Sequence, residues 1–296
     1  MKPEVDEEHD EDESPEDDPE KRFLIHEGIV HDARRIGQNA AVRLPVDSPA
    51  NPRVAAALRA LRDGERIPLE GARSLAEALA AGVVPESVFF EEGSADEALL
   101  ARAEGAGARL HPASGRVVGR LSDLATSRGV VALAPLPPHG LEALPREDAG
   151  TWLLLDGLQD PSNVGAILRS AEAFGAAGAL LSVGCASPFS ARALRASAGS
   201  ALRLPLATGI PLPRALAWLA ERGIPLAGGV ARGGCDPATT PLPRPVAIAV
   251  GSEGSGLSPE TERALRVRLT LPMLGRVESL NAAVAASLLL YLRGQA

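Results

Sequence analysis

Residues 246–256 read VAIAVGSEGSG, an apolar run that ends in a glycine-rich loop. Every position from 246 to 250 is apolar, so the run lacks the alternation of a half-buried strand and is too short for a typical helix. Such a run predicts a strand that is buried on both faces of a parallel sheet. The loop after it would then lie at the carboxyl end of the strand, where open α/β sheets bind ligands. The stretch therefore favours an α/β fold with a binding site at this edge.

The second half of the chain repeats this arrangement, and apolar runs alternate with helical segments. The expected strands are 152–155, 179–183, 204–206, 246–250 and 269–271, and the expected helices are 164–174, 192–198, 212–221 and 280–292. Strands separated by helices predict a parallel sheet that helices cover on both faces. We assign this α/β domain to residues 151–296.

The first half predicts a smaller α/β domain over residues 51–134. The expected helices begin at 51, 74 and 97, the expected strands are 87–90, 109–111 and 130–133, and residues 67–71 are interpreted as a break between two helices. Residues 135–150 are rich in proline, which is typical of a linker. Residues 21–50 show no clear period and are interpreted as a lead-in of unknown structure.

Charge is divided unevenly along the chain. Residues 1–20 hold twelve acidic residues against one lysine, a net charge of −11, so the remaining chain carries +3 of the total of −8. A segment of this composition buries too little apolar surface to fold, and we expect an acidic disordered tail. The tail is interpreted either as a solubilising segment or as a mobile polyanion that competes with nucleic acid for the basic body.

Composition argues against several classes of protein. The chain has two cysteines and no four-ligand cluster of cysteine and histidine, so we expect no structural zinc. Its longest strongly apolar stretch, 280–292, is shorter than the about 20 residues that span a bilayer. The N-terminus lacks the apolar core of a signal peptide, so we expect a cytoplasmic protein. Cys185 and Cys235 are expected to be small buried side chains rather than nucleophiles.

Three segments at the carboxyl ends of expected strands carry residues suited to chemistry. The residues singled out in the first segment are Asn163, Gly165 and Arg169. Those in the second are Gly251, Glu253 and Gly256, and those in the third are Pro272, Met273, Gly275, Ser279, Leu280 and Asn281. Taken singly, each can be an ordinary capped helix or glycine loop, with Asn163 capping the helix that follows it. The second segment lacks both the full dinucleotide-binding pattern and a phosphate-loop lysine.

Taken together and in this order, the three segments resemble the motifs of the SpoU/TrmH family of RNA ribose 2′-O-methyltransferases, in the SPOUT superfamily. The first matches Asn-x-Gly-x-x-x-Arg, the second Gly-x-Glu-x-x-Gly, and the third Pro-Met-x-Gly-x-x-x-Ser-Leu-Asn. The resemblance is strong over 151–293 and weaker over 51–134, where it implies a small RNA-binding domain. It also implies a C-terminal trefoil knot, a homodimer and S-adenosylmethionine as cofactor.

The resemblance further implies roles for individual residues. The implied cofactor-binding residues are Gly251, Gly256, Leu271, Met273 and Leu280, and the implied catalytic residues are Arg169, Asn163, Glu253, Ser279 and Asn281. Free arginine gives up its proton only in strongly alkaline solution, so we expect Arg169 to grip a phosphate and stabilise the emerging alkoxide rather than act as a base. Asn163 would orient Arg169 and the loop, and Glu253 would orient Arg169 or bind a ribose. Ser279 and Asn281 would position cofactor or hydroxyl at the start of the helix.

The expected function is S-adenosylmethionine-dependent 2′-O-methylation of a ribose in structured RNA, with ribosomal RNA favoured over transfer RNA because of the added N-terminal domain. Two alternatives stay open: a knotted RNA-binding module without activity, and an unrelated nucleotide-binding α/β enzyme. The intact motif residues argue against the first, and the missing phosphate loop argues against the second. The helix expected at 280–292 is apolar on more than one face, which is typical of a helix that also contributes to a dimer interface.

Overall fold

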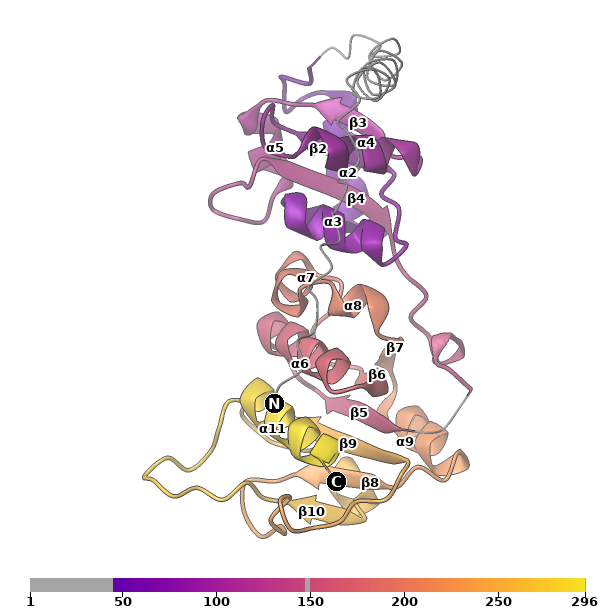
Figure 1. The fold of residues 1–296 in the computed structure, drawn as a ribbon, viewed down its shortest axis with the longest axis vertical. Coiled ribbons are helices and arrows are strands. Elements are labelled where there is room, and N and C mark those ends of the chain that lie inside the picture. Colours follow the sequence, from indigo (N-terminus) through magenta and orange to yellow (C-terminus); the bar gives the residue numbers. More distant parts are fainter. Residues whose placement is uncertain (1–44, 147–149, 296) are drawn as a thin grey trace, which may run out of the picture. The chain divides into compact units, whose positions relative to one another are not determined.

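A computed structural model describes residues 45–146 and 150–295, so the expected acidic tail and most of the lead-in lie outside the described residues. The part of the chain from residue 45 onward forms one compact unit. It contains two sheets, a four-stranded one that we call the small sheet and a six-stranded one that we call the large sheet (Figure 1). No helix in the described ranges is long and apolar enough to cross a membrane.

The small sheet is mixed and is covered by helices from the first half of the chain. Its strands, in spatial order, are β1 (Arg66–Glu70), β4 (Val130–Pro135), β2 (Ser87–Phe90) and β3 (Arg109–Pro112), and its helices are α2 (Pro52–Arg62), α3 (Ala72–Ala80), α4 (Glu97–Gly105) and α5 (Gly115–Leu121). Strand β4 runs antiparallel to both neighbours, whereas β2 and β3 are parallel. Alternate residues of β4 belong to different core clusters, as expected of a strand buried on both faces.

Residues 67–71 do not form the expected break, because Arg66–Glu70 is strand β1. Its two charged ends and its proline hide the strand pattern in the sequence. Pro68 is tolerated because β1 is an edge strand that pairs only with β4. Helix α5 was also missed, and Val46, from the end of the lead-in, is buried and forms an isolated bridge with Ala113.

The large sheet is entirely parallel, as the apolar runs predicted. Its strands, in spatial order, are β10 (Val267–Leu269), β8 (Leu226–Gly229), β9 (Val246–Gly251), β5 (Thr151–Asp156), β6 (Ala176–Ser182) and β7 (Leu206–Ile210). Its helices are α6 (Pro161–Ala173), α7 (Ala191–Ser197), α8 (Ser200–Arg203), α9 (Leu212–Glu221), α10 (Pro259–Ala264) and α11 (Ala282–Gln295). A short 3-10 turn, η1 (Leu141–Ala143), lies in the proline-rich segment before β5.

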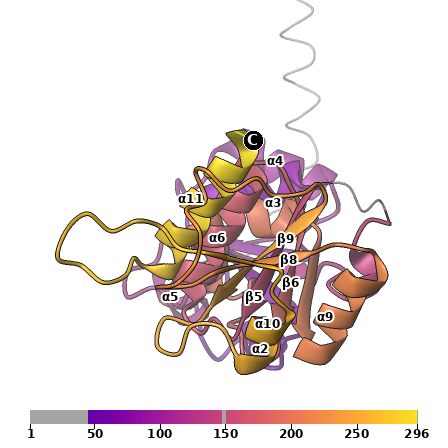
Figure 2. The same ribbon diagram turned by 90° about the horizontal axis from the view of Figure 1, so that it is seen from below.

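Helices cover both faces of the large sheet. Leu153 and Leu155 of β5 belong to the core cluster that includes residues of α6 and α11. Trp152 and Leu154 belong to the cluster on the other face, which includes Trp218 of α9. Figure 2 shows α6 and α11 on one side of the strands and α9 on the other. This two-sided burial explains why residues 152–155 of β5 are all apolar.

The order of the strands places a topological switch point between β5 and β9. After β5 the chain crosses through α6 to β6 on one side, whereas after β9 it crosses through α10 to β10 on the other side. The connections that follow these two neighbouring parallel strands therefore lead toward opposite edges of the sheet. Ligands of open α/β sheets bind at such a switch point, outside the carboxyl ends of the strands.

Two helix starts beside this switch point determine how the motif residues are presented. The expectation that Asn163 caps α6 was wrong: the cap is Asp160, whose carboxylate accepts a hydrogen bond from the Ser162 N–H at 2.7 Å. Pro161 is the first helical residue, where its missing N–H costs nothing. Asn163 thus lies within the first turn, with its side chain available for other contacts. Asn281 does cap α11, since its Oδ1 accepts from the N–H groups of Ala283 and Val284.

Candidate active site

Side chains from all three motif segments meet at the carboxyl edge of β5 and β9. Asn163 donates a hydrogen bond through Nδ2 to Oε1 of Glu253, in the loop after β9. The Oδ1 of Asn163 accepts from Nδ2 of Asn281 at 3.0 Å. Because the other atom of the Asn281 amide already accepts from the start of α11, the direction of this chain of hydrogen bonds is fixed. We call Glu253, Asn163 and Asn281 the polar chain.

The loop after β9 holds Glu253 in a tight turn. The backbone groups of Ser252 and Gly256 exchange two hydrogen bonds of 3.0 Å. A Cβ atom at Gly251 would overlap the backbone of Gly256, which itself has φ +69°, so both positions require glycine. At Gly254, by contrast, a Cβ atom would meet nothing within 4 Å. The loop is therefore closed on its inner side and leaves open space beside its tip.

A buried carboxylate that the sequence analysis did not single out anchors the same loop. Asp156, the last residue of β5, is 7% exposed. Its Oδ2 accepts from the N–H of Ser258 at 2.8 Å and from the hydroxyl of Thr261 at 2.7 Å. These bonds tie the end of β5 to the beginning of α10. The signal in the sequence was an acidic residue directly after a fully apolar strand.

The third segment is only partly brought to the polar chain. Its loop between β10 and α11 extends away from the sheet (Figure 2), and Leu274 is fully exposed. Leu271 packs against the core and Met273 is half-buried, whereas Leu280 is 36% exposed. Ser279 is exposed and makes no hydrogen bond with another described residue. Of the third segment's polar candidates, Asn281 thus joins the polar chain and Ser279 does not.

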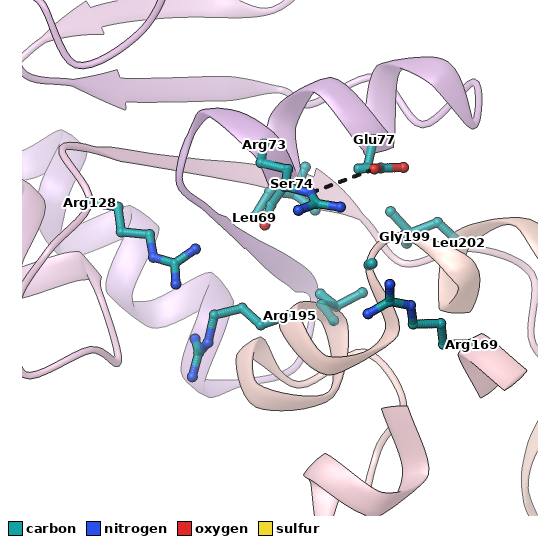
Figure 3. A pocket seen from close by; sticks show the side chains of 11 residues that line it. Leu69, Arg73, Ser74, Glu77, Arg128, Arg169, Arg195, Gly199 and Leu202 are labelled. Atoms are coloured by element: carbon teal, nitrogen blue, oxygen red, sulfur yellow. Dashed lines mark ion pairs between the residues drawn. The ribbon is translucent and has the colours of Figure 1, made fainter. Parts of the chain in front are cut away.

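Arg169 lies six residues beyond Asn163 on α6, and no hydrogen bond joins these two side chains in the described part of the chain. Both polar atoms of the Asn163 amide are engaged by Glu253 and Asn281. Within the described ranges Arg169 forms no ion pair or hydrogen bond. Its side chain instead lines a pocket together with three other arginines (Figure 3). The guanidinium group is therefore free to meet an external anion.

The two cysteines differ in environment. Burial raises the pKa of the Cys185 thiol, whose sulfur accepts from the N–H of Leu158 and donates to the carbonyl of Leu155. A thiol with a raised pKa is a weak nucleophile at neutral pH, as expected for a structural cysteine. Cys235 is exposed, so the expectation that it is buried was wrong. The described residues contain no group of three or more acidic, histidine or cysteine side chains that could hold a metal ion.

One face of α11 is apolar and exposed. Val284, Leu288 and Tyr291 are 47%, 39% and 46% exposed and recur at four- and three-residue spacing, so they share one side of the helix. Phe174, at the end of α6, makes an edge contact with Tyr291 at 5.7 Å between ring centroids. We call these four residues the α11 stripe. The opposite side of α11 is buried through Ala286 and Leu290 against the chain's own core.

Comparison with known proteins gives a consistent result. A model of the SpoU rRNA Methylase family matches residues 150–291. A Mycobacterium avium protein described as an uncharacterized tRNA/rRNA methyltransferase is 33% identical over 229 residues, 74% of each chain. The chain also resembles the crystal structure of an RNA 2′-O ribose methyltransferase, with a TM-score of 0.72, 32% identity, and 84% of this chain and 98% of that chain covered. A second similar structure, an AdoMet-bound rRNA methyltransferase from Sinorhizobium meliloti, has a TM-score of 0.75, 25% identity, and coverages of 85% and 97%.

Proposed function

Because this chain belongs to the SpoU rRNA methylase family of RNA methyltransferases, we propose that it methylates the 2′-hydroxyl of a ribose in structured RNA, using S-adenosylmethionine. The observation that carries the proposal is the polar chain. Residues 90 and 118 positions away from Asn163 in the sequence form hydrogen bonds with its side chain at the switch point of the large sheet. Stability alone does not demand such a cluster at a solvent-facing edge, whereas a binding site does.

The residues around the switch point fit S-adenosylmethionine. An adenosyl group needs backbone donors and acceptors for the edge of its ring and apolar side chains for its faces. The loop 251–256 offers accessible backbone beside Gly254, and Leu271, Met273 and Leu280 offer apolar surface. When bound, this cofactor supplies an electrophilic methyl group on a sulfonium centre. The loop after β9 and the loop before α11 are the segments that we propose to hold it.

The chain's own residues would bind and polarise the ribose. The hydroxyl oxygen gains negative charge as its proton leaves, and a fixed cation nearby lowers the cost of that charge. We assign this role to Arg169, whose guanidinium group forms no ion pair among the described residues. Glu253, held by Asn163, would accept a hydrogen bond from a ribose hydroxyl. Ser279 would act only after its loop closes toward Asn281.

We propose ribosomal RNA as the substrate, with transfer RNA as the alternative. The S. meliloti structure is an rRNA methyltransferase and matches 85% of this chain, including most of the part that precedes the large sheet. We propose that residues 51–134, which contain the small sheet, form the RNA-binding domain and that residues 151–296 form the methyltransferase domain. An enzyme of cellular RNA would work in the cytoplasm.

Two further properties belong to this proposal. We propose that the C-terminal chain forms a trefoil knot, consistent with the packing of α11 against α6, β8 and β9. We also propose a homodimer whose interface includes the α11 stripe, because exposed apolar side chains on one helix face favour association. Neither property is needed for the polar chain to form within one copy.

Methyl transfer itself tests the proposal. Full-length protein is incubated with radiolabelled S-adenosylmethionine and with ribosomal or transfer RNA from a strain that lacks the gene. A methyl group on the 2′-oxygen blocks alkaline cleavage of the next phosphodiester, so the label should appear in alkali-resistant dinucleotides of ribosomal RNA. Label in transfer RNA supports the alternative, and label in mononucleotides overturns ribose methylation. RNA binding without any transfer would indicate an inactive binding module.

Arg169→Ala provides a sharper test within the same assay. We expect transfer to fall by about a hundredfold or more, because a preorganised cation at the reacting oxygen is lost. Cofactor affinity, measured by calorimetry, should stay within about twofold, since Arg169 lies outside the glycine loops. Arg214→Ala is the matched control and should leave transfer unchanged, because Arg214 is an exposed residue of α9, which covers the opposite face of the large sheet. Unchanged turnover in Arg169→Ala would remove this residue from the catalytic role.

A further inference from the structure

A pocket of about 240 Å³ lies between α3 and the turn that joins α7 to α8. Arginines from four segments line it: Arg73 on α3, Arg128 before β4, Arg169 on α6 and Arg195 on α7. Figure 3 shows the side chains of Arg73, Arg128 and Arg169 reaching toward the same space from different elements. We call this the arginine pocket. It brings residues from both halves of the chain together beside the proposed catalytic arginine.

The arginines of the pocket are not all neutralised by the chain. Arg195 is paired with the buried Glu70, and Arg73 lies 3.9 Å from Glu77. Arg128 and Arg169 form no ion pair within the described ranges. The neighbouring Arg203 pairs with both Glu77 and Glu172. Five guanidinium groups thus face three carboxylates, which leaves two positive charges without a partner in this region.

The pocket is held in shape by contacts that have no role in binding an anion. Glu70, which fixes Arg195, also accepts from the hydroxyl of Ser122 at 3.2 Å. The aliphatic part of Arg128 lies against Gly71, where a Cβ atom would be 3.1 Å from Cδ of the arginine. Gly199 has φ +84°, and a Cβ atom there would lie 2.9 Å from Cβ of Glu77. These contacts already fix the positions of the residues before an anion binds, so little conformational entropy of these positions is lost on binding.

The lining indicates which part of a nucleic acid would enter. Guanidinium groups bind phosphate oxygens through paired, forked hydrogen bonds. Among the described residues, no aromatic side chain lines the pocket, so it offers no aromatic platform for a base. The side chain of Arg73 is 75% exposed, so the pocket is open to solvent. One phosphate of a longer nucleic-acid strand can therefore enter it while the rest of the strand stays outside. These features favour the phosphodiester backbone over a base.

We propose that the arginine pocket binds a backbone phosphate of the substrate RNA, close to the ribose that is methylated. This inference rests on the proposed function and adds a binding site to it. Arg128 and Arg73 supply contacts from the first half of the chain, while Arg169 contacts the phosphate on the side nearest the reaction. The first half of the chain then positions the target nucleotide directly, in addition to any grip on more distant RNA.

Salt-dependent RNA binding tests the proposal. The full-length protein, Arg128→Glu and Arg214→Glu are titrated into a fluorescently labelled hairpin RNA over a range of KCl concentrations. Arg214 is an exposed arginine of α9, outside both the pocket and the proposed RNA-binding domain, and its substitution changes the net charge equally. We expect Arg128→Glu to weaken binding about tenfold and to reduce the slope of log affinity against log salt by about one, since one phosphate contact is lost. Arg214→Glu should change affinity by less than about twofold.

The outcomes separate this inference from the proposed function. If both substitutions weakened RNA binding equally, only the overall charge of the protein would matter, and the proposed phosphate site in the arginine pocket would be overturned. Saturable binding of inorganic phosphate at constant ionic strength, lost in Arg128→Glu while RNA binding is kept, would assign the pocket to a free anion instead. Failure of the wild-type protein to bind S-adenosylmethionine or to transfer methyl groups would overturn the function, whatever the RNA titration gives. Circular dichroism confirms that the exposed substitutions leave the fold intact.

Discussion

The amide of Asn163 uses its two ends for two different segments. Its nitrogen donates to Glu253, and its oxygen accepts from Asn281. No other residue type of this size offers one donor end and one acceptor end at neutral pH. Aspartate has the same shape but only acceptors when ionised, so it would place a second negative charge against Glu253. The identity of this residue therefore controls whether the polar chain can exist.

Asn163→Asp should lower the rate of methyl transfer by at least about tenfold at alkaline pH, because two adjacent carboxylates repel and the link to the loop is lost. As pH falls, one of the two carboxyl groups takes up a proton and becomes a donor, so the ratio of variant to wild-type rates should rise. Asn163→Ala is the control, since it removes the link without adding a charge and should show no such recovery. Parallel pH profiles for the two variants would contradict this account.

Motif spacing predicted which residues meet at the candidate site, but it did not predict how they meet. The positions of Asn163, Glu253 and Asn281 followed from three patterns at the ends of expected strands. The role of Asp156 did not, because its two partners belong to a helix that the sequence pattern failed to reveal. The start of α6 was misplaced since Asp160 and Asn163 are both good capping residues, and only the proline between them favours the earlier start.

At the scale of elements, α6 and α7 pack so closely that one position admits only glycine. A Cβ atom at Gly165 would overlap the carbonyl of Ala193 and lie 2.7 Å from Cβ of Ala196. Alanine is favoured over glycine in a helix by about 1 kcal/mol, which would stabilise α6 if propensity decided the outcome. The neighbouring atoms are backbone and a short side chain, so they cannot move aside without separating the helices.

Gly165→Ala should therefore destabilise the protein by about 1–3 kcal/mol, since overpacking outweighs the gain in helix propensity. Gly119→Ala is the matched control: it lies inside α5, and a Cβ atom there would meet nothing within 4 Å. That substitution should stabilise by up to about 1 kcal/mol. Urea unfolding of both variants measures the difference. A Gly165→Ala protein as stable as the wild type would mean that α6 and α7 are less closely packed.

Helices and strands with an uninterrupted helical or apolar pattern could be predicted from the sequence. Strands that form because of tertiary contacts with neighbouring elements could not. Residues 152–155 of β5 and 246–250 of β9 are uninterrupted apolar runs, and all of these residues are buried. Strand β8, in contrast, is four residues long and contains two glycines, one of which lets a side chain pack against the strand: a Cβ atom at Gly228 would lie 2.6 Å from Cδ2 of Leu265. Strand β1 carries a proline that only an edge position tolerates. Both strands exist because of tertiary contacts that no local pattern encodes.

At the scale of the whole molecule, the α11 stripe should control association. Leu288→Glu places a charge in the middle of the exposed apolar face, and we expect sedimentation velocity to show a shift from dimer to monomer. Val84→Glu is the control, because Val84 is 36% exposed against 39% for Leu288 but lies in the first half of the chain. A wild-type protein that sediments as a monomer at micromolar concentration would contradict the proposed dimer.

The division of charge along the chain leads to the last prediction. Residues 1–20 lie outside the described residues. Their net charge of −11 nevertheless changes the electrostatic field of the remaining chain, whose net charge is +3. Deleting them should tighten non-specific RNA binding, because a tethered polyanion competes with phosphates for arginines such as those of the arginine pocket. The effect should shrink with added salt, since the screening length is only about 8 Å at about 0.15 M. Cofactor affinity should not change. If truncated and full-length proteins bind hairpin RNA equally at low ionic strength, the acidic segment does not compete with RNA, and the arginine pocket is open to RNA in the intact chain as well.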